Sequence, residues 1–300
     1  MVLKIVLALI VIFNGLYGIK FFMDYYKHKQ EAKEEPGNPI FLAIYTCIAQ
    51  VLGTFGISDF ALGAIVYRKK NIVPDKNLPG TLNTACTIPV AVMALAYITA
   101  IECDITTLVV CIVCQAIGSY IGPRFVAKMP ADRIRTFMGT GLVVACLMIL
   151  AQKFNIIPQS GLSNGLEGIK LIIAALLVFV FGALNNVGIG SYAPVMATIY
   201  ALGLNPAVAF PIMMGACTFS CSVGSMEFVK YGNYSRKVTM YSTIFGTLGV
   251  LFAVFVVKSL DTEMLKWVVA FVVGYTGLSM IIKELKSKKI ENNNSINMSN

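Results

Sequence analysis

Charged side chains are scarce in this chain of 300 residues, since Asp, Glu, Lys and Arg together make up only 13%. Soluble domains carry about a quarter, so the composition argues against a soluble protein and leaves little room for a domain outside a membrane. Hydrophobic residues make up 57%, and the mean hydropathy is +0.76. The sequence therefore predicts a polytopic membrane protein.

Residues for acid–base and metal chemistry are also few. The one histidine, His28, lies among the lysines of a charged linker, whereas a metal site needs several converging ligands. The sequence contains no Ser/His/Asp triad, HExxH motif, Walker loop or pair of intramembrane carboxylates. We therefore expect no enzyme activity, no catalytic residue, no metal and no cofactor, and an ATP-driven pump is disfavoured.

The net charge and the cysteines have simple interpretations. The charge of +9 comes from bases in short loops between apolar runs, as membrane topology requires, so we expect no nucleic-acid partner. Seven of the eight cysteines lie inside apolar segments and are interpreted as reduced packing residues, with Cys103 the exception. Cys111 and Cys114 have the spacing of a redox motif, but no neighbouring base lowers a thiol pKa there.

Apolar runs of helical length divide the chain. Residues 2–23 are interpreted as a retained membrane helix, because no A-x-A-like cleavage site follows. Further apolar runs cover 79–100, 105–123, 134–151, 206–226, 238–257 and 265–282. The predicted organisation is an extra N-terminal helix with a charged linker (1–38), a first membrane repeat (39–151), a linker (152–168), a second membrane repeat (169–283) and a disordered cytoplasmic tail (284–300).

Two apolar segments, at about 40–67 and 169–202, are each interrupted by glycines and polar residues. The first break reads GTFGISD, from Gly53 to Asp59, and the second reads GALNNVGIGS, from Gly182 to Ser191. The pieces of the first segment are too short to span a core of ~30 Å. Irregular backbone at membrane depth survives only inside protein or beside a wet cavity. The breaks therefore predict a binding site.

The breaks belong to an internal repeat. Gly56-Ile57 aligns with Gly188-Ile189 at an offset of 132 residues (188 − 56), and Ala85-Cys86-Thr87 recurs as Ala216-Cys217-Thr218 at an offset of 131 (216 − 85). The stretch MPADRIR (129–135) parallels LDTEMLK (260–266) at the same offset. Transporters often carry such duplications, with the substrate site at the interface between the repeats.

The placement of the 24 lysines and arginines indicates how the two repeats face. If both broken segments cross the membrane, the two sides collect 13 and 11 bases; if both are re-entrant, they collect 19 and 5. The positive-inside rule expects such asymmetry. We therefore predict re-entrant segments, three full crossings per repeat, inverted repeats, an amino terminus outside and a carboxyl terminus in the cytoplasm.

A broken helix presents unpaired N–H groups and the positive end of a helix dipole, so two breaks that meet from opposite sides suit a compact oxyanion. Ser191 is either a helix cap or a ligand. Asp59 is either a cap or, because an acid at membrane depth is usually functional, a proton-coupling residue. The candidate substrate-binding residues are Gly53, Thr54, Gly56, Ser58, Cys86, Thr87, Asn185, Asn186, Gly188, Gly190, Ser191, Cys217 and Thr218, with Asp59 as the coupling candidate.

These motifs resemble those of the sulfite exporter TauE/SafE family of integral membrane proteins. The resemblance rests on the two glycine-rich breaks, on the paired Ala-Cys-Thr motifs, and on the helix from Gly118 to Gly122 that leads into a basic loop with Pro123 and Pro130. It covers about residues 40–283, leaving the first helix and the tail outside. It implies transport of small sulfur-containing anions such as sulfite or sulfonates, usually as export. Ser58-Asp59 and Ser191 stand where the family would show consecutive glycines.

The sequence thus predicts an all-α, inverted-repeat secondary transporter in the cytoplasmic membrane of a prokaryote. It would export a small sulfur-containing anion by alternating access, with the lipid bilayer and the anion as its partners. Two alternatives remain open: a proton- or cation-coupled importer that uses Asp59, and a membrane redox or sulfur-relay protein that uses Cys111 and Cys114.

Overall fold

The computed structural model describes residues 2–121, 163–185 and 191–259, together with scattered residues between 140 and 154 and between 264 and 282. These residues form helices and no strand, apart from an isolated bridge between Ser163 and Leu204. The helices are α1 (Val2–Lys27), α2 (Lys29–Glu34), α3 (Pro39–Thr54), α4 (Asp59–Lys69), α5 (Leu78–Ala100), α6 (Ile105–Ile121), α9 (Gly168–Asn185), α10 (Tyr192–Ala201), η1 (Pro206–Val208), α11 (Ala209–Tyr231), α12 (Arg236–Tyr241), the π-helical η2 (Ser242–Gly246) and α13 (Thr247–Ser259). The predicted all-α class is confirmed.

Long apolar helices make this a polytopic membrane protein. Within the described residues, α1, α5, α11 and the continuous stretch Arg236–Val256 are long and apolar enough to cross a membrane. The predicted run 105–123 corresponds to α6, which is shorter. The predicted run 134–151 is described only at scattered positions, whereas the run 265–282 contains the short apolar helix Ala270–Ser279. The motif 129–135 lies outside the described residues, as do the tail beyond 282 and all of 260–266 except Met264.

The first broken segment is a re-entrant hairpin. Helix α3 ends at Thr54 and α4 begins at Asp59, with the turn between them. The Lys70 ammonium, just after α4, lies 4.6 Å from the centre of the Phe41 ring in the first turn of α3. One helical turn further in, the rings of Tyr45 and Tyr67 are 5.4 Å apart. Helix α4 therefore returns to the end from which α3 entered, as the charge count predicted.

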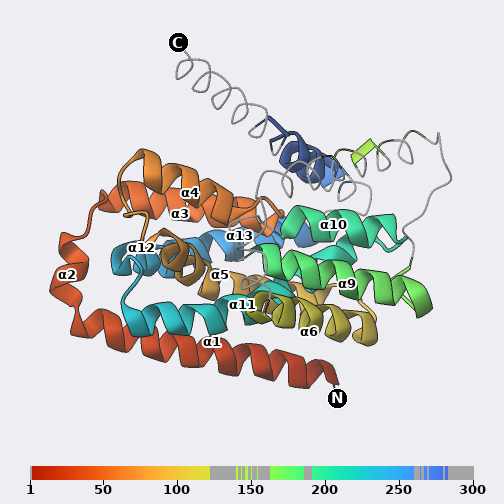
Figure 1. The fold of residues 1–300 in the computed structure, drawn as a ribbon, viewed down its shortest axis with the longest axis horizontal. Coiled ribbons are helices and arrows are strands. Elements are labelled where there is room, and N and C mark those ends of the chain that lie inside the picture. Colours follow the sequence, from red (N-terminus) through yellow and green to blue (C-terminus); the bar gives the residue numbers. More distant parts are fainter. Residues whose placement is uncertain are drawn as a thin grey trace, which may run out of the picture.

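The second broken segment has the same form. Helix α9 ends at Asn185 and α10 begins at Tyr192; residues 186–190 lie outside the described residues. The Lys170 ammonium, near the start of α9, donates to the carbonyl of Leu202, which follows α10, at 3.2 Å. Figure 1 shows the α3–α4 pair at the left end of the bundle and the α9–α10 pair at the right end. The two hairpins therefore enter the protein from opposite ends.

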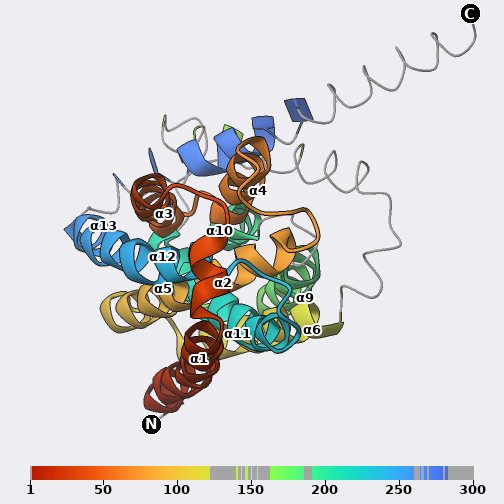
Figure 2. The same ribbon diagram turned by 90° about the vertical axis from the view of Figure 1, so that its left-hand side faces the viewer.

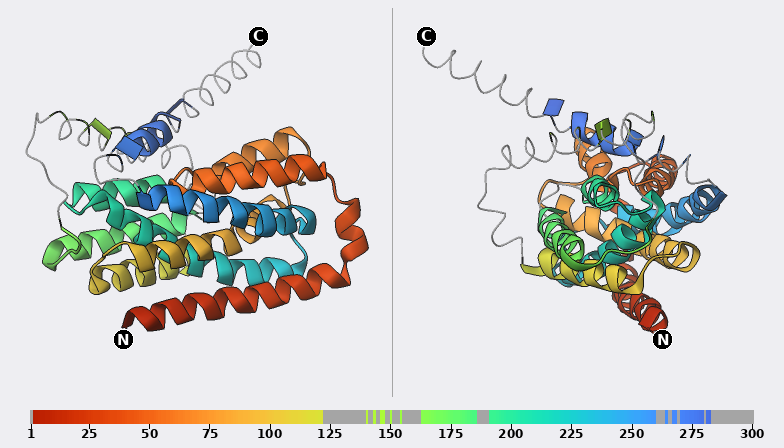
Figure 3. Two further views of the ribbon diagram at one scale, coloured as in Figure 1. Left: turned by 180° about the vertical axis from the view of Figure 1, so that it is seen from behind. Right: turned by 90° about the vertical axis from the view of Figure 1, so that its right-hand side faces the viewer.

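Helices α5 and α11 run side by side through the bundle between the two hairpins (Figures 1 and 3). Their contact is polar at several points, and the hydroxyls of Thr87 and Ser225 are 2.8 Å apart. Thr84 on α5 makes a similar contact, at 2.7 Å, with Thr239 on α12. Within a membrane, helices gain little from apolar contact alone, so interhelical hydrogen bonds and small residues hold them together. These hydroxyls therefore join the first repeat to the second.

Helix α1 is built into the bundle rather than attached at its edge. The Asn14 side chain, which is 4% exposed, donates to the Thr218 hydroxyl on α11 at 2.9 Å. The Tyr17 hydroxyl donates to the carbonyl of Thr84 on α5, also at 2.9 Å. The N-terminal helix therefore contacts both central helices. Figure 2 shows α2 lying across the end of the bundle, between α1 and α3.

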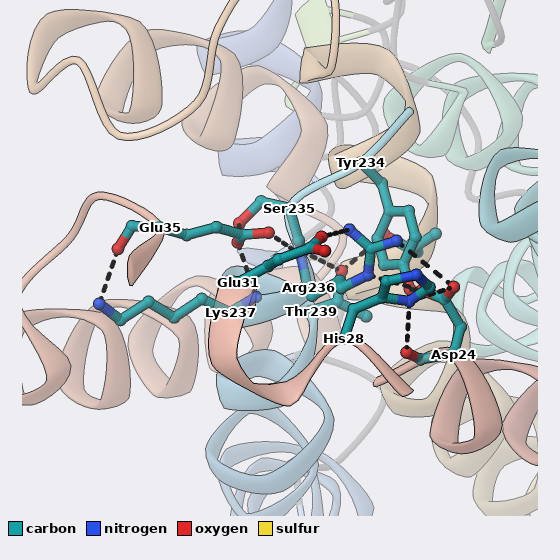
Figure 4. Close-up of polar contacts among 10 residues, drawn as sticks. Asp24, His28, Glu31, Glu35, Tyr234, Ser235, Arg236, Lys237 and Thr239 are labelled. Carbon is teal, nitrogen blue, oxygen red and sulfur yellow. Dashed lines mark hydrogen bonds and ion pairs between the residues drawn. The ribbon is translucent and has the colours of Figure 1, made fainter. Parts of the chain in front are cut away.

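The linker after α2 fastens this end of the bundle through Glu35 (Figure 4). Its carboxylate accepts hydrogen bonds from the Ser235 hydroxyl at 2.6 Å and from the backbone N–H groups of Arg236 and Lys237 at 3.1 and 2.9 Å. These N–H groups open α12, and a carboxylate at a helix N-terminus is favoured by the helix dipole. Glu35 therefore ties the linker after α2 to the start of α12.

Asp24, near the end of α1, adds an ion pair to this fastening (Figure 4). It accepts from the Arg236 guanidinium at 2.7 Å and from the Tyr234 hydroxyl at 2.6 Å, and His28 lies 3.1 Å away. Burial, reinforced by the hydrogen bond to Asp24, raises the pKa of the Tyr234 hydroxyl, so this group stays a donor. His28, which the sequence placed in the charged linker, lies between α1 and α2 next to this carboxylate.

Candidate functional site

The tips of the two hairpins meet inside the protein. A narrow pocket separates them, and the described residues around it leave no room for a water molecule. The pocket is lined by Ser58, Asp59, Phe60, Ser191, Tyr192 and Cys217. Three of these six come from the first tip, two from the second, and one from α11. The predicted meeting of the two breaks in one site is therefore seen in the described residues, and the site is closed in this conformation.

The first tip is shaped by glycine. Gly56 has φ +92, in the left-handed region that side chains avoid, and a Cβ there would lie 2.7 Å from the Met196 sulfur on α10. Glycine thus allows both the turn and the close approach of the second hairpin. Gly53 is buried within the last turn of α3, next to the side chain of Gln50.

Thr54, also predicted to line the site, forms hydrogen bonds at the end of α3. Its hydroxyl donates to the carbonyl of Gln50 at 2.8 Å, and its own carbonyl accepts from the Tyr97 hydroxyl at 2.9 Å. These bonds satisfy carbonyl groups at the end of α3, one of which has no partner within the helix. The hydroxyl proton of Thr54 is therefore not directed to the pocket.

Asp59 opens α4 and is 8% exposed. One carboxylate oxygen accepts from the backbone N–H of Phe60 at 3.0 Å, and the other accepts from the side-chain amide of Gln50 at 3.1 Å. Within the part of the chain that the structure describes, no lysine or arginine forms an ion pair with it. The first tip therefore carries an acidic side chain at the helix end that was expected to attract an anion.

The second tip carries no acidic residue in its sequence, GALNNVGIGS. Ser191 takes the N-cap position of α10, but its side chain makes no capping hydrogen bond. The Tyr192 hydroxyl points to the Cys217 sulfur at 3.7 Å. Of the predicted residues here, Asn185 ends α9 without a described side chain, and Asn186, Gly188 and Gly190 lie outside the described residues.

The repeated Cys-Thr motifs lie on α5 and α11, as predicted, and three thiols gather there. The Cys86 sulfur is 3.4 Å from that of Cys221, which is 3.5 Å from that of Cys217. Only Cys217 lines the pocket. Thr87 and Thr218 were also predicted to line the site, but their hydroxyls form hydrogen bonds between helices. The Thr87 hydroxyl bonds to that of Ser225, and the Thr218 hydroxyl accepts from the side chain of Asn14.

The alternative redox site gains little support. Cys111 and Cys114 are free thiols on α6, and neither lines the pocket between the tips. Burial, together with the charge of Asp104, raises the pKa of Cys103 to about 12, so this thiol is not a reactive thiolate. Among the described residues, no group of three His, Cys, Asp or Glu side chains is arranged to hold a metal ion.

Sequence reasoning missed five residues that contact the site or its supports, namely Gln50, Phe60, Tyr192, Cys221 and Asn14. Gln50 and Asn14 share a signal that was available, because each is an amide inside an apolar run. A buried amide in a membrane helix needs a partner. Tyr192 and Cys221 carried no such signal, since their position depends on how α10 and α11 cross.

Two re-entrant hairpins that enter from opposite ends and meet at a buried pocket, inside a bundle of membrane-spanning helices, define a membrane transporter. The chain belongs to the sulfite exporter TauE/SafE family, whose pattern matches residues 1–149 and 171–299. Members of this family are transporters rather than enzymes, and membership implies sulfite or a related anion as the class of substrate.

The extent of this match corrects one expectation. The resemblance was expected to begin near residue 40 and to end near 283, but the match begins at residue 1 and reaches 299. The contacts of Asn14 and Tyr17 with α11 and α5 give the physical reason, since α1 is part of the packed bundle. Neither the curated proteins nor the solved structures searched contain a match.

Proposed function

We propose that this protein exports a small sulfur-containing oxyanion, of the sulfite or sulfonate type, through the pocket between the two hairpin tips. The observation that carries the proposal is the meeting of Ser58 and Asp59 with Ser191, Tyr192 and Cys217 at that pocket. Family membership supports the class of substrate.

The second tip supplies the chemistry for an anion. The start of α10 presents backbone N–H groups and the positive end of a helix dipole. The hydroxyls of Ser191 and Tyr192 add donors, and the Cys217 sulfur adds a polarisable contact for a sulfur-containing group. Such a site holds a compact oxyanion through many donors without a fixed cation.

Transport through this pocket requires the tips to part, because the pocket is closed in this conformation. In the proposed cycle, movement of the hairpins against α5 and α11 opens the pocket first to one side and then to the other. Described basic residues gather at the end where the α3–α4 hairpin enters, as in α2, α4 and α12. By the positive-inside rule this end faces the cytoplasm, and the membrane potential then favours exit of an anion.

The test is flux from vesicles that contain the purified full-length protein. Vesicles that contain the protein and are loaded with sulfite, thiosulfate or sulfoacetate should release at least one of these anions faster than loaded vesicles without the protein. Ser191→Ala and Tyr192→Phe should slow this release, whereas Tyr26→Phe, at an exposed position on α1, should not. Absence of release for all three anions would count against the proposal.

The importer alternative makes a different prediction in the same vesicles. It requires an inward proton or cation gradient to drive uptake of the anion, with Asp59 as the coupling residue. Accumulation of the anion under such a gradient would favour import over export.

The sulfur-relay alternative is separated by two substitutions. Cys111→Ala with Cys114→Ala should abolish a relay, whereas the transport proposal expects only a mild loss of flux. The three neighbouring thiols of Cys86, Cys217 and Cys221 are a second group of cysteines that can be replaced by alanine in the same experiment.

A further inference from the structure

A second cavity, larger than the closed pocket between the tips, also borders Asp59. It has a volume of about 10 Å³, room for one water-sized sphere. Its walls come from α3, α4, α5 and the π-helical η2, and they consist of Tyr45, Thr46, Ala49, Gln50, Asp59, Tyr67, Leu82, Ala85 and Ser242. Among the described residues, Asp59 alone lines both spaces.

Two polar atoms of the cavity-lining residues lack a partner. Gln50 is 3% exposed, and its side-chain oxygen is buried without a hydrogen-bond partner among the described residues, as is the Tyr45 hydroxyl. A buried polar atom without a partner costs about 1–3 kcal/mol, so native proteins satisfy such atoms with a water or an ion. The cavity is where that missing partner would lie.

Apart from the hydroxyls of Tyr45 and Tyr67, the polar side chains that line the cavity offer acceptor oxygens. The Thr46 hydroxyl donates its proton to the carbonyl of Leu42 at 2.7 Å, and the Ser242 hydroxyl donates to the carbonyl of Ala85, also at 2.7 Å. Each oxygen therefore has only lone pairs left to offer. The carboxylate of Asp59 and the side-chain oxygen of Gln50 accept but do not donate. A space lined by so many acceptors is electronegative and favours a cation.

The charge of Asp59 sets the valence of that cation. One carboxylate balances one positive charge, and no lysine or arginine of the described residues supplies it. Calcium prefers six to eight oxygens with several carboxylates, and magnesium keeps several waters, which this single-sphere cavity does not accommodate. A bare monovalent ion with carboxylate, amide and hydroxyl oxygens as ligands fits both the charge and the volume.

The neighbouring backbone is irregular in a way that fits a ligand site. The π-helical turn Ser242–Gly246 interrupts the helix facing α3, and a Cβ on Gly246 would lie 2.9 Å from Cγ of Gln50. Single π-helical turns within α-helices occur frequently at functional sites. Here the turn places Ser242 on the cavity wall and leaves space for the side chain of Gln50.

We propose that this cavity binds a sodium ion through Asp59, Gln50 and Tyr45, and that the bound ion neutralises Asp59 so that the adjacent pocket accepts an anion. The consequence for the anion rests on the proposed function, whereas the binding of sodium does not. The two sites share Asp59, so each ligand should raise the affinity for the other.

Sodium binding can be measured without transport. The purified full-length protein is unfolded thermally in detergent with NaCl, KCl or choline chloride at equal ionic strength. Sodium should raise the Tm in a saturable way, because a ligand that binds only the folded state stabilises it as its concentration exceeds the Kd. Potassium and choline should not produce this rise.

Three substitutions locate the ion. Gln50→Leu, Asp59→Asn and Tyr45→Phe should each raise the sodium concentration for the half-maximal Tm shift by on the order of tenfold or more, the loss expected when one buried polar partner is removed. Tyr45→Phe removes one oxygen and keeps the ring, so it remains informative if Gln50→Leu fails to fold. Gln115→Leu is the matched control, since Gln115 is a buried glutamine on α6 that does not line the cavity; it should keep the sodium response.

Three outcomes would overturn the proposal: no sodium-specific Tm shift in the native protein, a shift that all three substitutions leave unchanged, or a stability that follows pH alone, which would indicate a proton at Asp59. A sodium shift without anion flux in vesicles would support this site and count against the proposed function. Sodium-gradient-driven accumulation of the anion would support the site and reverse the proposed direction of transport.

Discussion

The two re-entrant hairpins have the same architecture but differ in charge at their tips. The first tip carries Asp59, whose carboxylate lies at the start of its own helix and is held by Gln50. The second tip presents Ser191 and Tyr192 at the start of α10 and has no acidic residue in its sequence. Of the two helix starts at the tips, therefore, the one at the second tip lacks an acidic residue. The comparison teaches that a structural repeat need not be a functional repeat.

The difference continues along the helices that follow the hairpins. Cys217 on α11 lines the pocket, whereas its counterpart Cys86 on α5 contacts Cys221 behind it. The proposed anion site thus includes Cys217 of α11, whereas the second cavity is lined mainly by α3, α4 and α5. Asp59 stands between the two.

The largest expected effect comes from crowding the contact of the tips. Gly56→Ala should destabilise the protein by about 2–5 kcal/mol, because left-handed backbone strain of ~1–2 kcal/mol adds to overpacking of ~1–3 kcal/mol against Met196. Gly203→Ala is the control, since Gly203 has φ +95 but its nearest neighbour, Lys170, would lie 3.8 Å from the new Cβ. Unfolding midpoints of the two variants measure the difference. Equal shifts would show that the tips do not press on each other.

Moving a charge to the second tip should abolish transport. Ser191→Asp is expected to slow anion flux by at least about 100-fold, because two like charges ~4 Å apart repel by ~4 kcal/mol at an effective dielectric constant of ~20. Ser191→Asn, which has a similar size and no charge, should retain far more flux. Reconstituted vesicles provide the measurement. Similar flux in the two variants would show that the anion does not bind at the second tip.

The paired cysteines should respond unequally. Cys217→Ala should lower the apparent affinity for the anion about fivefold, roughly 1 kcal/mol, because it removes a pocket contact. Cys86→Ala, at the equivalent place in the first repeat, should leave the affinity within about twofold. The apparent affinity is read from flux against anion concentration. The opposite ranking would assign the anion to the first repeat.

The smallest effect is expected at the paired threonines. Thr87→Val and Thr218→Val should each cost about 0.6 kcal/mol of stability, the average for a hydrogen bond between membrane helices, because their hydroxyls bond to Ser225 and Asn14. Anion affinity should stay unchanged in both. A folded Thr87→Val variant without flux would instead indicate that the Thr87 hydroxyl contacts the substrate.

Much of the fold could be predicted from the sequence because lipid leaves few options. Apolar length located α1, α5, α6, α11 and the helix from α12 to α13 within a few residues. Glycines and polar residues located the first break, and the distribution of lysine and arginine distinguished a re-entrant hairpin from a crossing. Each of these signals is local or statistical, so it survives without knowledge of the packing.

The site was predictable only in part. Sequence placed Ser58, Asp59, Ser191 and Cys217 in one site, and all four line the pocket. It also placed Thr87 and Thr218 there, although their hydroxyls join helices, because a motif alone does not say which way a side chain points. Gln50 and Tyr45 were missed since their importance depends on a cavity that α3, α4, α5 and η2 form together.

The amino-acid sequence by itself determined that this protein lies in a membrane, is helical and has two broken helices, because hydropathy and glycine placement act within single segments. Only the tertiary structure decided that Tyr192 lines one pocket with Asp59, that α1 contacts α11 through Asn14, and that a second cavity borders Asp59. Those relations join residues more than 100 positions apart, and the packing of side chains between helices fixes them.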